Sequence, residues 1–139
     1  MKPIQNITVE TLDGNSKTLE ALVDSGSFYT IIRSDALPVT TSMYYYREPK
    51  LFGTAAQEGK LKILGVITLI IEINNQRIDD SVLISDHLSS DMIIGAKTMQ
   101  AWDISIVNDN GNTKIKVGRD MRDPVITTVC DINAITKSL

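Results

Sequence analysis

The stretch ALVDSGSFYTII, residues 21–32, places one carboxylate between two apolar runs. Residues 21–23 lead into Asp24, and Ile31 and Ile32 follow a Ser-Gly turn. A buried carboxylate without a partner is costly, whereas Asp-Ser-Gly taken alone is ordinary turn chemistry. The stretch therefore predicts either a surface turn or a carboxylate that the protein uses.

The composition indicates one globular domain. The chain has 139 residues, of which 42% are hydrophobic and 22% are charged, which is enough for a core of ordinary size. The net charge of −3 and the lack of a basic block exclude nucleic acid as the main partner. We expect a single domain over residues 1–139, with a core at about 5–107 and a hairpin and tail of undefined role at 108–139.

We expect no targeting signal from the sequence pattern. The start MKPIQNITVE lacks the long apolar stretch of a secretory signal. The longest apolar run, ILGVITLIIEI, is interrupted by Glu72 and is too short to span a bilayer. We therefore expect a cytoplasmic protein, or one within a viral or transposon polyprotein, without a membrane partner.

The hydrophobic pattern predicts β-strands along nearly the whole chain. NITVET and TLEALV alternate around the turn LDGNSK, which predicts a hairpin that ends at Asp24. FYTIIR predicts a further strand, and YYYREPKLF predicts an edge strand broken by Pro49. KLKILGVITLIIEI, bent at Gly65, and RIDDSVLIS predict a long hairpin around NNQ, and DMIIG predicts a short buried strand.

One short helix is expected after these strands. In AKTMQAW, residues 96–102, the apolar Met99 and Trp102 lie three positions apart on one helical face. DISIV and TKIKV flank NDNGN and predict a last hairpin. In the tail, VITTV is compatible with a strand, and DINAITKSL with a terminal helix capped by Asp131.

Most common catalytic arrangements are excluded by the residues present. His87 is the only histidine, which excludes a His-cluster metal site, and its polar loop favours a solvated side chain. Cys130 is the only cysteine and lies in an apolar segment, so we expect a buried hydrophobe and no intrachain disulfide. Phosphate-binding GxxxxGK and GxGxxG motifs are absent. We expect neither metal nor cofactor, and Asp24 remains the candidate.

A second motif gives the Asp24 stretch more weight. MIIG, residues 92–95, comes directly before the expected helix. LVDSGS and IIGAKTM match, in this order, the early and late motifs of the retropepsin-like aspartic proteases. TLIIEINNQRIDDSVLIS, which lies between them, resembles that family's long strand, turn and return strand. Over about residues 5–107 the chain thus resembles this family.

The resemblance implies an all-β retropepsin-like acid protease barrel with one short helix, which acts as a homodimer. Each chain of that family supplies one aspartate, so Asp24 would face its own copy across a two-fold axis. Two close carboxylates share a proton. One activates a water as general base and the other polarises the scissile carbonyl as an acid. The implied function is an aspartic endopeptidase.

The resemblance also implies roles for the neighbours of Asp24. Ser25 matches a hydroxyl residue that bonds across the dimer, and Gly26 lets the backbone pass close to the carboxylate. Ser27 matches a hydroxyl that donates to the aspartate in pepsin-like relatives, and we expect it to favour the ionised carboxylate and an acidic pH optimum. Ile94 and Gly95 belong to the late structural motif.

Substrate contacts are implied in the same way. Leu22, Ile31 and Ile93 match positions that line the cleft, which implies a peptide or protein substrate with apolar residues at the cleaved bond. Each is also a fitting core residue. KLFGTAAQEGKLKIL matches the flap, with Gly53 and Gly59 as hinges. Its tip, residues 54–58, contains the substrate-contacting candidates Thr54, Ala55 and Ala56.

Two departures from the family pattern keep rival functions open. Viral members have an Arg after the late Gly that pairs with an Asp after the catalytic turn, and here these positions are Ala96 and Phe28. More than thirty residues also follow Trp102, so the dimer contacts must differ. The alternatives are a catalytically weak retropepsin-like domain for dimerisation or peptide binding, and a β-barrel binding module whose Asp-Ser-Gly is an ordinary turn.

Overall fold

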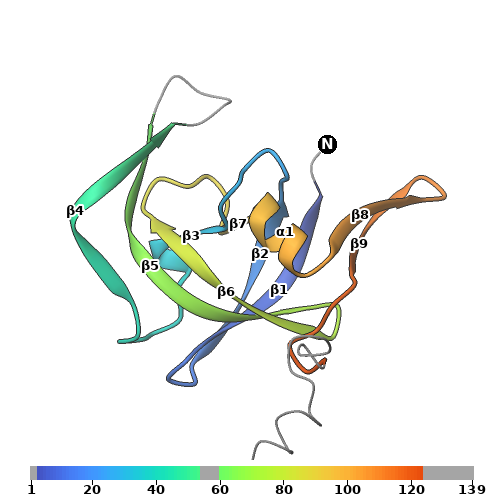
Figure 1. The fold of residues 1–139 in the computed structure, drawn as a ribbon, viewed down its shortest axis with the longest axis horizontal. Coiled ribbons are helices and arrows are strands. Elements are labelled where there is room, and N and C mark those ends of the chain that lie inside the picture. Colours follow the sequence, from blue (N-terminus) through green and yellow to red (C-terminus); the bar gives the residue numbers. More distant parts are fainter. Residues whose placement is uncertain (1–2, 54–59, 124–139) are drawn as a thin grey trace, which may run out of the picture.

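The computed structural model describes residues 3–53 and 60–123, and the strands dominate it (Figure 1). One 3₁₀ turn (Ser34–Ala36) and one short helix interrupt the strands. The elements in chain order are β1 (Ile4–Thr11), β2 (Ser16–Val23), β3 (Ile31–Arg33), β4 (Tyr44–Gly53), β5 (Lys60–Ile73), β6 (Gln76–Ser85), β7 (Met92–Ile94), α1 (Ala96–Ala101), β8 (Ile104–Asp109) and β9 (Asn112–Val117).

Six strands close into a barrel. The strand order is β1-β2-β7-β3-β6-β5-β4, and an additional pairing of β1 with β5 closes the ring. β4 remains outside this ring as an edge strand on β5, and β8 and β9 form a separate two-stranded sheet beyond α1 (Figure 1). The pairs β2–β7 and β3–β6 are parallel, whereas the other pairs are antiparallel. Among the described residues, no helix has the length and apolar character needed to cross a membrane.

The turn chemistry explains why the predicted hairpins form. Asn74 and Asn75 between β5 and β6 both have positive φ, 50° and 67°. Asn110 and Gly111 between β8 and β9 have φ of 51° and 81°. Two successive residues with positive φ match the twist of two-residue β-hairpins, and Asn and Gly tolerate this backbone best. The hairpins expected around NNQ and NDNGN are confirmed.

The edge strand β4 behaves as its proline predicts. Its pairing with β5 shifts register between Tyr45 and Lys50, and Pro49 lies in this interruption. Gly65 on β5 pairs with Tyr45 at the edge of the same irregularity. Proline has no N–H for the ladder, so a break on an edge strand is the site where it does least damage.

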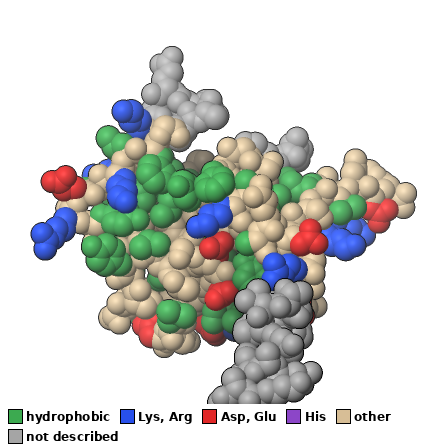
Figure 2. Space-filling model, in the orientation of Figure 1, with side chains coloured by type: hydrophobic (Ala, Val, Ile, Leu, Met, Phe, Trp, Pro, Cys, Tyr) green, Lys and Arg blue, Asp and Glu red, His purple; other side chains and the backbone are tan. Residues whose placement is uncertain are grey.

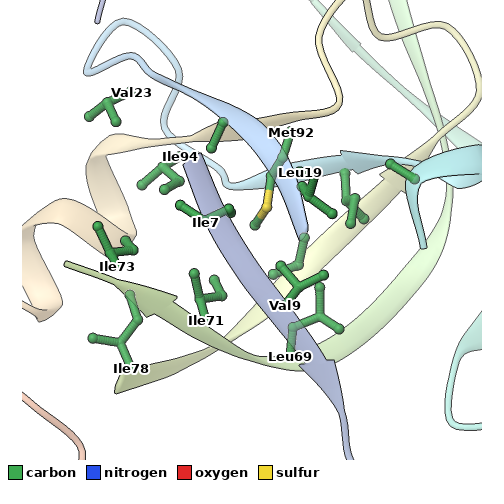
Figure 3. Close-up of a cluster of buried hydrophobic side chains, with 14 of the residues drawn as sticks. Ile7, Val9, Leu19, Val23, Leu69, Ile71, Ile73, Ile78, Met92 and Ile94 are labelled. Carbon is green, nitrogen blue, oxygen red and sulfur yellow. The ribbon is translucent and has the colours of Figure 1, made fainter. Parts of the chain in front are cut away.

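The main core fills the barrel with alternating side chains of its strands. Along β5, Ile67, Leu69, Ile71 and Ile73 are buried at every second position. They meet inward-facing residues of β1, β2, β6 and β7 (Figure 3). Burying one such side chain contributes about 1.5–3 kcal/mol, so this cluster carries much of the stability. The members labelled in Figure 3 are Ile7, Val9, Leu19, Val23, Leu69, Ile71, Ile73, Ile78, Met92 and Ile94.

A second, smaller cluster lies where the barrel meets the β4–β5 hairpin. Its buried members are Ile31 on β3, Ile63 on β5 and Leu88 in the loop before β7. Half-buried side chains complete it, namely Tyr46, Phe52, Leu61, Leu83 and Ile93. Because these side chains are only partly covered, the cluster is an apolar surface as well as a support for the hairpin.

Two predicted boundaries differ from the structure. FYTIIR was expected to be one strand, but only Ile31–Arg33 belongs to β3. Residues 28 and 29 instead remain in the preceding loop, whose carbonyl groups accept bonds from residues that begin α1. The helix ends at Ala101, with Trp102 as its C-cap. The expectations for VITTV, DINAITKSL and Cys130 lie outside the described residues.

Candidate active site

Asp24 lies at the point where two parallel strands end together. β2 ends at Val23, which pairs with Ile94, the last residue of β7. The Asp24 amide then donates to the Ile94 carbonyl at 2.9 Å. Asp24 therefore lies at the rim of the barrel, where its side chain is half-buried.

The Asp-Ser-Gly segment forms a tight turn around the carboxylate. The Gly26 amide donates to Asp24 Oδ1 at 2.9 Å, and the Ser27 amide donates to the Asp24 carbonyl at 3.1 Å. A Cβ on Gly26 would lie 3.0 Å from Asp24 Oδ1, which is tighter than ordinary van der Waals contact. Glycine therefore allows the backbone to approach the carboxylate and to donate to it.

The late motif holds the turn from behind. The Ala96 amide donates to the Ser27 carbonyl at 2.7 Å, and the Lys97 amide donates to the Phe28 carbonyl at 2.9 Å. The first amides of a helix have no partner within the helix, so α1 can offer them to the loop. A Cβ on Gly95 would lie 2.7 Å from the Ser27 carbonyl oxygen. The two predicted motifs thus meet in space through main-chain bonds.

The two serines of the turn have different surroundings. Ser25 is exposed, and its predicted bond across a dimer stays a prediction because one chain is described. Ser27 is half-buried, and its hydroxyl donates to the Tyr29 carbonyl at 2.8 Å. A hydroxyl has one hydrogen. The Ser27 hydroxyl therefore supports the loop within one chain, and its expected effect on the Asp24 carboxylate stays a prediction.

The three predicted cleft residues lie in one row across the sheet. Ile93 on β7 pairs with Leu22 on β2 on one side and with Ile31 on β3 on the other. Leu22 and Ile93 are half-buried, whereas Ile31 is 6% exposed. Ile31 and Ile93 belong to the second apolar cluster. The structure thus brings these three side chains together beside Asp24, although their contact with a substrate stays a prediction.

Sequence reasoning missed an aromatic contact between the Asp24 loop and β4. The Tyr29 ring lies 5.4 Å from the Phe52 ring and 5.0 Å from the Phe28 ring. Phe28 is 56% exposed and Tyr29 is 40% exposed, so these two rings form an apolar surface on the loop that follows Asp24. Hydrophobic side chains gather on the face between the β4–β5 hairpin and the centre of the molecule (Figure 2). The loop aromatics were assigned to a strand, and this assignment hid the contact.

The arms of the expected flap are a regular hairpin. Gly53 pairs with Lys60 and Phe52 pairs with Leu61, so β4 and β5 run together to the last described residues of each strand. Gly53 is exposed. The tip candidates and the second expected hinge, Thr54, Ala55, Ala56 and Gly59, lie outside the described residues.

Other candidate chemistry lies away from Asp24 or is not found. His87 is exposed in the loop between β6 and β7. In the described part of the chain, no group of three or more His, Cys, Asp or Glu side chains is placed to hold a metal ion. The arrangement at Asp24 is therefore an oriented carboxylate on a firmly held loop with apolar neighbours, which is a suitable setting for acid–base chemistry on an apolar ligand.

Comparisons with known proteins bear on the fold. No protein-family description and no curated protein matches the chain. Among solved structures, the EIAV protease complexed with the inhibitor HBY-793 is similar, with a TM-score of 0.54 and 16% sequence identity. The match covers 73% of this chain and 88% of that chain. The predicted fold class is therefore confirmed: the described chain is a mostly β, six-stranded barrel with one short helix, which matches a retropepsin-like fold.

Proposed function

We propose that this protein is an aspartic endopeptidase. In this proposal a homodimer hydrolyses peptide bonds with a water activated between two Asp24 carboxylates, one from each chain. The observation that carries the proposal is the Asp24 turn, in which the carboxylate is oriented by the Gly26 amide at the rim of a retropepsin-like barrel. The similarity of this fold to that of the EIAV protease supports the same proposal.

The need for two copies follows from the chemistry. The sequence contains one Asp-Ser-Gly, so one chain supplies one carboxylate of the pair. Two carboxylates at close range share one proton, because both cannot ionise easily. The ionised partner takes a proton from the water, and the protonated partner donates to the carbonyl of the scissile bond. The two apparent pKa values then describe the pair of carboxylates and not either residue alone. This mechanism requires no metal ion.

The neighbouring residues support this role. Ser25, Gly26 and Ser27 shape the loop, and Ile94 and Gly95 hold it from behind. Leu22, Ile31 and Ile93 form the apolar row that would contact the substrate side chains at the cleaved bond. The half-exposed cluster at the base of the β4–β5 hairpin adds further apolar surface. We therefore expect substrates with apolar residues on both sides of the bond.

The alternative is a retropepsin-like domain that dimerises or binds peptides and has little catalytic activity. Ala96 favours it, because its side chain cannot make the ion pair that viral relatives form at this position. The Asp24 turn favours catalysis, because main-chain bonds to Ile94, Ala96 and Lys97 hold its loop without that pair.

The test compares the wild-type protein with Asp24→Asn on unfolded casein and a peptide library, from acid to neutral pH, with and without pepstatin. We expect cleavage by the wild type, inhibition by pepstatin, and a loss of about 10²-fold or more in the variant. Activity should also rise more steeply than linearly with protein concentration in the range where dimers dissociate. If the wild type and Asp24→Asn are both dimeric and neither cleaves a substrate, the proposal is overturned in favour of a binding domain. A stable monomer would favour a β-barrel module.

A further inference from the structure

A chain of side-chain hydrogen bonds runs behind the Asp24 loop from β6 to the late motif. The Gly95 amide donates to Thr30 Oγ1 at 3.0 Å. Thr30 Oγ1 lies 2.5 Å from Thr98 Oγ1, and Thr98 Oγ1 donates to Asp80 Oδ2 at 2.5 Å. Thr30 is 2% exposed and Thr98 is fully buried. Direct bonds thus connect β6, the loop that carries Asp24, the N-cap of α1 and α1 itself.

The chemistry of the four groups fixes the direction of each bond. A backbone amide only donates, an ionised carboxylate only accepts, and each hydroxyl has one hydrogen. Because Thr98 donates to Asp80, the hydroxyl of Thr30 must donate to Thr98. In this series of hydrogen bonds, every donor therefore points from Gly95 towards Asp80. Bonds aligned in this way polarise and strengthen one another.

This series of bonds ends at Gly95, which packs against the loop that carries Asp24. The Gly95 backbone packs against the loop so closely that a Cβ would lie 2.7 Å from the Ser27 carbonyl oxygen. The next amide, that of Ala96, donates to the same carbonyl at 2.7 Å. Thr30 is the loop's last residue, and its carbonyl accepts the Leu83 amide at 3.0 Å. A change in this network would therefore move the loop that carries Asp24, at Thr30 directly and at Ser27 through the Gly95 backbone.

We propose that Asp80 is a positioning residue, which acts through Thr98 and Thr30 to hold Gly95 and thereby the Asp24 loop in its working geometry. This inference rests on the proposed protease function. Asp80 is suited to the role because it is half-buried on β6 and its other oxygen, Oδ1, accepts the Ser81 amide at 2.8 Å. Asp80 lies on β6, outside the row of Leu22, Ile31 and Ile93.

The first experiment measures kcat and KM for two pairs of variants in the full-length protein. Thr98→Val removes the hydroxyl at equal volume, and Thr98→Ser keeps it. Asp80→Ala removes the acceptor, and Asp79→Ala removes a neighbouring exposed carboxylate as a matched control. We expect Thr98→Val and Asp80→Ala to lower kcat about 10-fold or more at nearly constant KM, because small misplacements of catalytic groups are costly. Thr98→Ser and Asp79→Ala should retain the wild-type kcat.

The second experiment does not depend on activity. Backbone NMR and amide hydrogen exchange report directly on the Gly95 N–H. In Thr98→Val and Asp80→Ala we expect its proton resonance to move upfield and its exchange to quicken, while the amides that pair β1 with β5 keep their protection. Because Asp80 lies at the half-exposed end of the network, we expect Asp80→Ala to fold even if Thr98→Val is too unstable to study.

The outcomes separate the two proposals. If the wild-type protein cleaves no substrate, the protease function is overturned. The NMR resonance and hydrogen exchange of the Gly95 amide in Asp80→Ala still test whether Asp80 holds the loop. Unchanged kcat and an unchanged Gly95 resonance in Asp80→Ala overturn the positioning role while the protease function stands. An equal loss of kcat in Thr98→Ser, or a rise in KM alone, also overturns it, because neither result follows from a broken hydroxyl chain.

Discussion

Asp24 and Asp120 both follow soon after a strand, yet the chain holds them in different ways. Asp120 is 7% exposed and is held through its carboxylate, which accepts from the amides of Arg77 and Arg122 and from the Arg122 guanidinium at 2.7–3.0 Å. The Asp24 loop is held mainly through main-chain atoms of residues 94–97. Removing the Asp120 carboxylate should therefore cost stability, whereas removing the Asp24 carboxylate should cost chemistry.

This difference separates a structural carboxylate from a candidate catalytic one. A loop fixed by its backbone keeps its shape when the side chain changes, so Asp24 can be used for acid–base work. A segment that is held by its carboxylate, like that around Asp120, loses its structural support when the carboxylate is removed. The comparison depends on the main-chain bonds from Ile94, Ala96 and Lys97 to the Asp24 loop, together with the close packing of Gly95, which we call the main-chain anchor. The largest predicted effect comes from disturbing this anchor at Gly95.

Gly95→Ala should damage both the loop and the activity. The new methyl group would lie 2.6 Å from the Tyr29 carbonyl carbon and 2.7 Å from the Ser27 carbonyl oxygen, so the backbone must shift. Forcing a group into a packed site costs about 1–3 kcal/mol of unfolding free energy. Urea unfolding and the cleavage assay measure the two effects.

Gly53→Ala serves as a control for stability only, because a Cβ at Gly53 meets nothing within 4 Å. Equal unfolding free energies for Gly95→Ala and Gly53→Ala would contradict the main-chain anchor. Retained cleavage in a destabilised Gly95→Ala protein would show that the Asp24 geometry does not depend on it.

Much of this arrangement could be predicted from local sequence. Alternating apolar residues gave β1, β2, β5 and β6, and the pairs at Asn74–Asn75 and Asn110–Gly111 gave the turns, because these signals depend on neighbours within a few positions. The two motifs around Asp24 and Gly95 also indicated the site. The structure adds the bonds that join them.

The rest depends on residues that are distant in the sequence. Phe28 and Tyr29 have strong strand propensity, but the amides of residues 96 and 97 hold the loop carbonyls and keep both residues out of β3. Thr30 and Thr98 are 68 positions apart, and neither local pattern indicates that the two hydroxyls meet. The role of Asp120 is equally hidden, because its partner Arg77 lies 43 positions earlier, on β6.

The second prediction concerns Asp120 and acid. The Arg122 guanidinium, followed by the amides of Arg122 and Arg77, holds the pKa of the Asp120 carboxyl well below its ordinary value of 3.8. Because the unfolded chain binds this proton more readily, the stabilisation is complete above about pH 5 and is lost as the pH falls towards the native pKa. Asp120→Asn should therefore be less stable at neutral pH and should lose less stability on acidification.

Urea unfolding of the wild type and Asp120→Asn from pH 7 to pH 3 measures this difference. Asp109→Asn is a matched control, because Asp109 is exposed and pairs with Lys114 at 3.4 Å. Parallel stability curves for the wild type and Asp120→Asn would show that Asp120 does not anchor this segment. Cleavage at neutral pH should survive in Asp120→Asn, which sharpens the contrast with Asp24→Asn.

The smallest expected effect belongs to Ser27→Ala and bears on how the Asp24 carboxylate is tuned. The hydroxyl donates to the Tyr29 carbonyl in this chain, so its loss should cost about 0.5–1.5 kcal/mol of stability and leave the limbs of the pH–rate profile unmoved. Ser27→Thr, which keeps a hydroxyl, should match the wild type. If the hydroxyl instead turns to the carboxylate in the assembled dimer, it stabilises the ionised form, and Ser27→Ala would move the acid limb to higher pH. Such a shift would mean that side-chain donors, and not only the Gly26 amide and the main-chain anchor, prepare Asp24 for catalysis.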